Sequence, residues 1–146
     1  MWERLERELM LVGRRQLHVR AATGERLEQS AYVLLRRLAD EGPMTIRQLT
    51  EAFCLDTSTV NRQTGALLRC GYIERIPDDE GGLARKLRIT AAGTRRVLAD
   101  QRHYQQWVAD ELSGWSHDDV AALTGLLARF NGTVEAARGR PWPRPD

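Results

Sequence analysis

Apolar residues recur every three to four positions along most of this chain, which is the spacing of one face of an α-helix. The first such segment covers about residues 2–20, and its apolar stripe consists of Trp2, Leu5, Leu9 and Val12. A second helix is expected over about residues 27–40. Gly42 and Pro43 end it, because glycine fits a left-handed cap and proline cannot continue a helix.

Two short helices joined by a tight turn are predicted next. Thr45 and Gln48 have the spacing of a capping box, which begins a helix over Ile46–Phe53. After the turn, Asp56 or Thr57 caps a second helix that runs to about residue 70. This arrangement is typical of a helix-turn-helix motif, whose second helix enters the major groove of DNA.

The periodicity then changes from helical to alternating. Residues 72–76 and residues 84–89 are predicted strands, and between them lies an acidic, glycine-rich turn over residues 77–82. A β-hairpin that directly follows a helix-turn-helix is a wing. The sequence therefore predicts a mainly α-helical protein with a small β-hairpin, an α+β winged helix-turn-helix.

Two further helices follow the wing. Thr90 is expected to cap a helix over about residues 91–112, and a capping box at Ser116 and Asp119 begins a last helix that ends near residue 137. The large apolar side chains of this region are expected in a core or an interface; they are Trp107, Leu112, Trp115 and Phe130. The proline-rich segment 139–146 is predicted to be a flexible tail.

Composition narrows the class of protein. The chain has 146 residues, of which 42% are apolar, and this is enough for one folded domain with a real core. No apolar run approaches the roughly 20 residues that span a bilayer, and the charged start is unlike a signal peptide. A cytoplasmic protein without membrane partners is expected. Cys54 and Cys70 match no metal motif and are interpreted as packing residues, with a redox role as the alternative.

Charge is distributed unevenly, although the net charge is only +2. Between Thr57 and Arg102 there are nine basic and five acidic residues. A local basic excess in a nearly neutral protein fits a nucleic-acid-binding face, and an ordinary solvated surface is the alternative.

The candidate chemistry lies on the second helix of the motif and on the wing. Arg62 could donate two hydrogen bonds to guanine, Asn61 or Gln63 could pair with adenine, and the short hydroxyls nearby suit phosphates. On the wing, Arg85 is the preferred groove residue, whereas Arg75 could equally form a salt bridge. The expected DNA contacts are Thr57, Ser58, Thr59, Asn61, Arg62, Gln63, Arg69, Arg85, Lys86 and Arg88.

No catalytic constellation is visible in the sequence. The three histidines, His18, His103 and His117, lack the spacing of metal ligands, and no glycine-rich loop suited to phosphate precedes a helix. The chain is therefore predicted to be neither an enzyme nor dependent on a metal or cofactor.

The central region contains an ordered series of short motifs. The matching positions are Leu49, Ser58, Thr59, Val60, Arg62, Leu67, Gly71, Ile73, Arg75, Thr90 and Gly93. In this order they resemble the MarR family of winged helix-turn-helix transcriptional regulators, over about residues 27–137. The resemblance implies a dimerisation helix in residues 1–26, a DNA-binding lobe in residues 27–93 (recognition helix about 57–70, wing about 72–90) and dimerisation helices in residues 94–138.

The resemblance also implies partners. It implies a homodimeric repressor that binds a pseudo-palindromic site on double-stranded DNA and is released by a small aromatic or anionic effector. His18, Tyr32 and His103 are candidates for lining the effector pocket, and plain surface or core roles are the alternative.

The chain departs from the family pattern at two places on the DNA-binding face. At the wing tip, Gly81 and Leu83 occupy positions that commonly hold Asp and Arg, which weakens the case for a minor-groove contact. In the recognition helix, Gly65 and Ala66 replace a common Asp-Arg pair. These departures keep a second hypothesis open, a winged-helix protein-interaction module with weak or no specific DNA binding.

Overall fold

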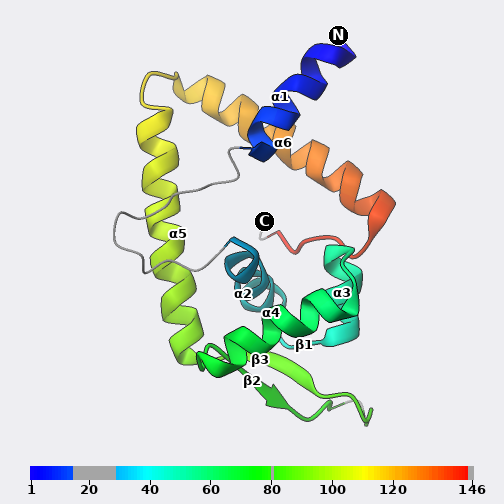
Figure 1. Ribbon diagram of the computed structural model, residues 1–146. Coiled ribbons are helices and arrows are strands. Elements are labelled where there is room, and N and C mark those ends of the chain that lie inside the picture. The colour runs from blue at the N-terminus through cyan, green and yellow to red at the C-terminus, as the bar shows by residue number, and fades with distance from the viewer. Residues whose placement is uncertain (15–28, 80, 145–146) are drawn as a thin grey trace.

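The computed structural model describes residues 1–14, 29–79 and 81–144, and Figure 1 shows their arrangement. The elements in chain order are α1 (Trp2–Arg14), α2 (Gln29–Glu41), β1 (Met44–Thr45), α3 (Ile46–Phe53), α4 (Thr57–Arg69), β2 (Ile73–Ile76), β3 (Lys86–Ile89), α5 (Ala91–Glu111) and α6 (His117–Arg138). The mainly α-helical winged architecture that the sequence predicts is confirmed. The predicted continuation of the first helix to residue 20, and the start of the second at residue 27, lie outside the described residues.

Helix starts follow local capping chemistry. The capping box at α3 is complete, because the Gln48 backbone N–H donates to Thr45 Oγ1 at 3.1 Å and the Thr45 N–H donates to Gln48 Oε1 at 2.9 Å. Asp56, rather than Thr57, is the N-cap of α4. Thr90 and Ser116 cap α5 and α6 as expected.

The sheet has one strand more than the sequence predicts. β1 pairs antiparallel with β3, which pairs antiparallel with β2, so the strand order is β1-β3-β2. Met44 lies opposite Leu87 across the first pair. Two residues are too short to show alternation, and β1 becomes a strand only because β3 lies beside it.

The core lies between α2, α3, α4, the sheet and the base of α5. Its buried apolar side chains are Leu34, Leu35, Leu38, Met44, Leu49, Val60, Leu67, Ile73, Leu87 and Val97. We call the part of the chain that encloses them, residues 29–97, the lobe. We call α1, α6 and the part of α5 beyond Val97 the end helices, and they contribute nothing to this core: α6 has no buried residue, and Trp2 on α1 is 73% exposed.

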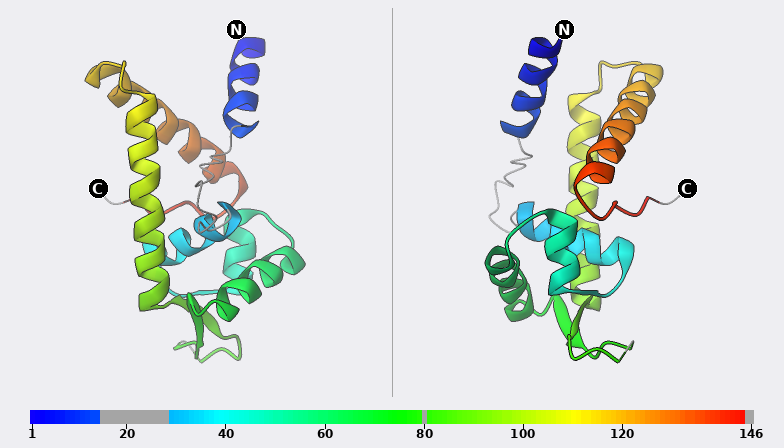
Figure 2. Two further views of the ribbon diagram at one scale, coloured as in Figure 1. Left: turned by 60° about the vertical axis from the view of Figure 1, so that its left-hand side comes forward. Right: turned by 90° about the vertical axis from the view of Figure 1, so that its right-hand side faces the viewer.

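The helices at the two ends of the chain stand away from the lobe. α5 rises out of the lobe and α6 turns back toward it, while Figure 2 shows α1 as a separate rod. No helix within the described residues combines the length and the apolarity needed to cross a membrane.

The last described residues differ from the predicted flexible tail. Residues 139–144, which we call the C-terminal strap, fold back between α6 and the ends of α2 and α3. The pattern of prolines suggested a free end because proline cannot extend a helix. It did not reveal that Trp142 meets an aromatic ring and an arginine of the lobe.

Candidate nucleic-acid interface

The N-terminus of α4 is held by one carboxylate. Asp56 accepts hydrogen bonds from the Thr59 N–H at 2.8 Å, from the Thr59 hydroxyl at 2.9 Å and from the Ser58 hydroxyl. The bond from Ser58, followed by those from Thr59, lowers the pKa of Asp56 to about 2. The two hydroxyls that were expected on phosphates are thus already engaged with the cap of their own helix.

The rest of α4 separates into a packed and an open face. Val60, Thr64 and Leu67 are buried, and the Thr64 hydroxyl donates to the Val60 carbonyl at 2.9 Å, which satisfies the buried oxygen. On the open face, Thr57, Ser58, Asn61, Arg62 and Arg69 are exposed, whereas Thr59 and Gln63 are half-buried. Of the seven α4 residues expected to contact DNA, five are therefore exposed and two are half-buried.

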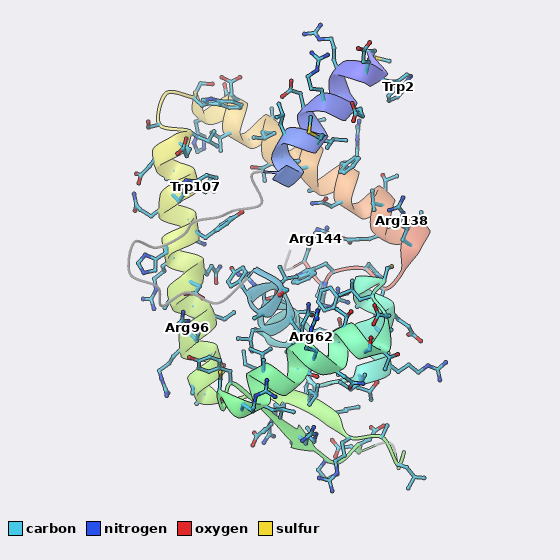
Figure 3. All side chains as sticks on the ribbon, in the orientation of Figure 1. Trp2, Arg62, Arg96, Trp107, Arg138 and Arg144 are labelled. Carbon is cyan, nitrogen blue, oxygen red and sulfur yellow. The ribbon has the colours of Figure 1, made fainter. Side chains whose placement is uncertain are left out.

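Arg62 is the most available cation of this helix. It is exposed and has no ion pair or hydrogen bond with any part of the chain that the structure describes. Figure 3 places it on the lobe, well separated from Trp2 and Trp107 on the end helices. Further along α4, the Arg69 guanidinium lies back over Gly65, where an added Cβ would be 3.5 Å from Arg69 Nη1.

The two faces of the wing differ in their chemistry. Alternation along paired strands puts Glu74, Lys86 and Arg88 on one face, and there Arg88 pairs with Glu74 at 2.7 Å while Lys86 pairs with Asp78 at 3.0 Å. Arg75 lies opposite Leu87 on the other face, next to α4. Lys86 and Arg88, expected as DNA contacts, thus lie on the ion-paired face.

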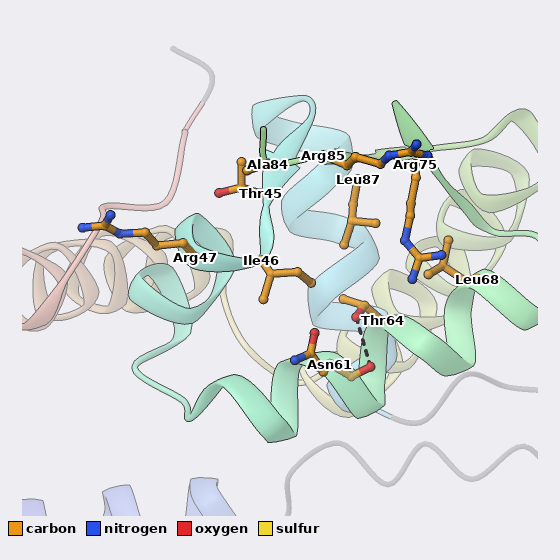
Figure 4. Close-up of a pocket in the computed structure, with 10 residues that line it drawn as sticks. All are labelled: Thr45, Ile46, Arg47, Asn61, Thr64, Leu68, Arg75, Ala84, Arg85 and Leu87. Atoms are coloured by element: carbon orange, nitrogen blue, oxygen red, sulfur yellow. Dashed lines mark hydrogen bonds between the residues drawn. The ribbon is translucent and has the colours of Figure 1, made fainter. Parts of the chain in front are cut away.

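Arg75 and Arg85 border a hollow between the wing and α4. Its volume is about 400 Å³, and Asn61, Thr64 and Leu68 line it from the helix side. Figure 4 shows Arg75 reaching from β2 toward Leu68, Arg85 extending toward Arg75 from just before β3, and Arg47 pointing away from both. Neither Arg75 nor Arg85 forms a salt bridge to another described side chain.

Arg75 is the residue that sequence reasoning left out of the expected contacts. The sequence left it open between the groove and a salt bridge, because the pairing of the hairpin decides which face an alternating residue takes. The register supplies the answer: Arg75 opposes the buried Leu87, and Arg88 opposes Glu74. The sequence signal that could have placed Arg75 was the possible pairing of Glu74 with Arg88 across the predicted hairpin.

Hydrogen bonds and a close backbone contact join the residues before the wing to the base of α5. The Thr90 N–H donates to the Tyr72 carbonyl at 3.0 Å, and the Thr90 hydroxyl donates to the Gly71 carbonyl at 2.7 Å. Gly93 lies so close to this turn that an added Cβ would be 2.1 Å from the Tyr72 oxygen. This close approach explains why glycine follows threonine by three residues here, and it holds the wing at a fixed angle beside α4.

The wing tip is uncharged at the two positions singled out from the sequence. Gly81 has a φ of +78°, a left-handed conformation that favours glycine, and Leu83 is fully exposed. Neither side chain can pair with phosphate. The wing cations that line the hollow beside α4 are Arg75 and Arg85.

Of the expected effector residues, Tyr32 and His103 lie in the described part of the chain, and His18 lies outside it. Tyr32 is half-buried and lies near Tyr104 of α5. The pKa of Tyr104 is raised, mainly by its burial and also by the neighbouring Tyr32. His103 is exposed. Neither Tyr32 nor His103 lines the hollow beside α4 or the groove of about 530 Å³ between α5 and α6.

The interpretation of Cys54 and Cys70 as packing residues is wrong, because both thiols are free and exposed. The Cys54 thiol donates to the Arg138 carbonyl at 2.8 Å. No group of three or more potential metal ligands gathers among the described residues.

Several known proteins are similar to this chain in sequence or in fold. The MarR family model matches residues 27–82. The uncharacterized HTH-type transcriptional regulator YxaD of Bacillus subtilis (strain 168) is 35% identical over 132 residues, which cover 88% of this chain and 92% of YxaD. A MarR family protein from Bacillus stearothermophilus has the same fold, with a TM-score of 0.76 at 21% identity over 88% of this chain and 91% of that one. So does Streptococcus pneumoniae FabT, solved in complex with DNA, with a TM-score of 0.71 at 18% identity over 94% and 99% of the two chains.

Proposed function

Because this chain belongs to the MarR family of transcriptional regulators, we propose that it binds double-stranded DNA as a homodimer and represses transcription at a pseudo-palindromic operator. Membership of this family makes the chain a regulator and not an enzyme, as the sequence predicts. FabT, which has the same fold, was solved in complex with DNA.

The observation that carries the proposal is the set of available arginines around α4. Arg62 projects from the exposed face of the helix, and Arg75 and Arg85 border the hollow on its wing side. An arginine has a planar fork that suits both guanine edges and phosphates. A groove that received α4 would bring a phosphate backbone toward the wing arginines.

The homodimer is supported by the apolar faces at the ends of the chain. Leu5 and Leu9 on α1, and Leu126, Leu127 and Phe130 on α6, are exposed in a single chain. Such exposed apolar side chains need a second surface to cover them, and an isologous dimer supplies the same surface twice. Two recognition helices would then lie about one DNA turn apart, roughly 34 Å.

We also propose that a small molecule releases the protein from DNA by changing the geometry of the dimer. An effector that binds better to a dimer with mismatched spacing would lower DNA affinity, and only by its differential affinity for the two forms. The groove between α5 and α6 is lined mainly by apolar side chains, including Tyr104, Val108 and Leu112, and it lies where the two end helices meet.

The first test is selection of bound DNA from a random pool with the purified full chain. A palindromic consensus is expected, with an affinity that falls steeply as salt rises, because neutralised phosphates release counterions. Absence of enrichment, together with salt-insensitive behaviour, would favour the interaction-module hypothesis instead.

Three arginine variants then test the assignment of contacts on the selected site. Arg62→Ala should lower specific affinity by about 1–3 kcal/mol and relax the base preference at one position of each half-site. Arg75→Ala should weaken all sites and reduce the salt dependence. Arg88→Ala is the matched control on the ion-paired face and should change affinity least. A larger loss for Arg88→Ala than for Arg75→Ala would contradict the assignment of the wing faces.

A further inference from the structure

Together, α5, α6 and the C-terminal strap form a path that leaves the lobe and returns to it. α5 begins inside the lobe, where Val97 is buried, and extends away from it. The chain turns at Ser113–Trp115 into α6, which returns toward the lobe (Figure 1). The C-terminal strap completes this path by joining the end of α6 to α2 and α3. The lobe is therefore attached to the end helices at two separate places, the base of α5 and the strap.

The first anchor of the strap is a buried arginine of α2. Arg37 is 1% exposed, and its Nε donates to Glu41 at 2.6 Å. Its Nη2 donates to the carbonyl of Pro141 at 2.8 Å, and its guanidinium lies 5.1 Å from the ring centre of Trp142. A buried cation is stable only where acceptors and a π-face compensate for lost water. The strap supplies one acceptor and the π-face.

Trp142 is the second anchor, and three elements of the protein hold it. Its ring meets Phe53 of α3 edge-on, with ring centres 6.3 Å apart. Its indole N–H donates to Asp40 of α2 at 3.0 Å, and its backbone N–H donates to Glu135 of α6 at 3.1 Å. This one residue therefore joins α2, α3 and α6.

The ends of α3 and α6 contact one another beside the strap. Arg144 forms two hydrogen bonds to Glu135, at 2.7 and 2.8 Å, and these lower the pKa of that carboxyl. The Cys54 thiol, at the end of α3, donates to the Arg138 carbonyl at the end of α6. Gly139 touches α3 so closely that an added Cβ would be 2.7 Å from the Glu51 carbonyl oxygen. Figure 3 shows Arg144 and Arg138 on this side of the molecule.

We propose that Trp142 and Arg37 are positioning residues for DNA binding, because the strap they anchor fixes the angle between α6 and the lobe. The inference rests on the proposed homodimer. If α6 belongs to the dimer interface, the angle between α6 and the lobe determines how far apart the two α4 helices lie. Since half-site spacing on DNA matches that separation, the strap determines which spacing the dimer prefers. Arg37 and Trp142 do this from outside the DNA-binding face.

The experiment measures spacing preference rather than affinity alone. Full-length wild type is titrated against synthetic sites that carry its selected half-site consensus with the spacing changed by up to two base pairs. Wild type should prefer one spacing by about tenfold or more, and Trp142→Ala should reduce that preference to roughly threefold or less. The half-site consensus itself should stay unchanged, because α4 is untouched.

Two variants serve as controls. Trp142→Phe keeps a ring over Arg37 and beside Phe53, and should retain most of the preference. Arg138→Ala removes only an exposed side chain, since the contact of this residue with Cys54 is made by its backbone carbonyl, and should behave as wild type. Sedimentation of each variant shows whether the dimer persists.

The outcomes separate this inference from the proposed function. If wild type selects no palindrome, the proposed function fails. If wild type prefers one spacing and Trp142→Ala keeps the same preference, the positioning role is wrong. Should Trp142→Ala aggregate, a chain that ends at Arg140 releases the strap instead; if that chain also fails to fold, the strap belongs to the lobe core and the proposal is overturned.

Discussion

The lobe and the end helices use apolar side chains in opposite ways. The ten buried apolar residues of the described structure all lie between Leu34 and Val97, whereas α6 contributes none. The large apolar residues left exposed gather mainly at the two ends of the chain; they include Met1, Trp2, Leu5, Leu9, Met10, Val12, Trp115, Leu126, Leu127 and Phe130. Both regions contain many apolar side chains, but only the lobe buries them within one chain.

This difference indicates two kinds of stability. The lobe has its own core, caps and sheet, so its folding depends on contacts within the chain. The end helices depend on a surface that a single chain does not provide, so their stability should depend on protein concentration. A change in one region should therefore leave the other region largely intact.

The largest effect is expected from a charge placed in the apolar face of α6. Phe130→Asp puts a carboxylate where we propose that two chains meet, and the variant should sediment as a monomer. DNA affinity should fall by about 10²–10⁴-fold, since two linked half-site contacts become one. Circular dichroism and denaturant unfolding should still show a folded lobe.

Asn131→Asp is the matched control for this variant. It adds the same charge one residue further along α6, at an exposed polar position. The control should remain dimeric and bind DNA nearly as wild type. If both variants dissociate alike, general repulsion and not the apolar face of α6 explains the loss. If Phe130→Asp stays dimeric, the exposed apolar side chains of α6 are not covered by a second chain.

The second effect is expected inside the lobe. Gly93→Ala places a Cβ against the Tyr72 carbonyl oxygen, which is backbone and cannot move aside without shifting the wing. We expect a loss of about 3 kcal/mol in the free energy of unfolding. Urea titration at two protein concentrations measures it. The loss should be the same at both concentrations, because the strain lies within one chain.

Gly65→Ala is the control for a glycine in a lobe helix. An added Cβ there meets only Arg69 Nη1, at an ordinary 3.5 Å. Replacing glycine by alanine in a helix should stabilise the lobe by up to about 1 kcal/mol. Equal destabilisation by the two substitutions would rule out the close approach at Tyr72 as the cause.

Much of the lobe was predictable because its helix starts depend on neighbours in sequence. The caps at Thr45, Thr90 and Ser116 each use a backbone N–H three residues along the chain, so local sequence is sufficient to locate them. β1 was missed because two residues become a strand only through β3. The strap was missed because its partners, Arg37 and Phe53, are distant in sequence.

The candidate site was predictable in part for the same reason. Helical periodicity located the exposed face of α4, including Asn61 and Arg62. The wing was harder, because cations of both faces look alike until the register shows which one meets an acid. Arg88 pairs with Glu74 on one face of the wing, and Arg75 lies on the other face beside α4. Which face each arginine takes depends on the strand register, which belongs to the tertiary structure.

The smallest effect concerns the cap of α4 and depends on pH. The folded pKa of Asp56, about 2, lies below its ordinary value of 3.8, so ionised Asp56 stabilises the folded lobe. This contribution is complete above pH 3.8 and is lost as pH falls through about 2. Asn can also cap a helix but does not titrate. Asp56→Asn should therefore be somewhat less stable than wild type at neutral pH, and the difference should narrow in acid.

Urea midpoints between pH 7 and pH 2.5 test this expectation, and a carboxyl titration by NMR assigns it to Asp56. A difference that stays constant across this range would mean that the cap carboxylate is not the titrating group. The same measurement in the Phe130→Asp background also tests the separation of the two regions. Because the Asp56 carboxylate bonds to Ser58 and Thr59 and to no other described residue, its pH dependence should be unchanged when the chain is monomeric. A pH effect that disappears with the dimer would show that the lobe does not fold independently of the end helices.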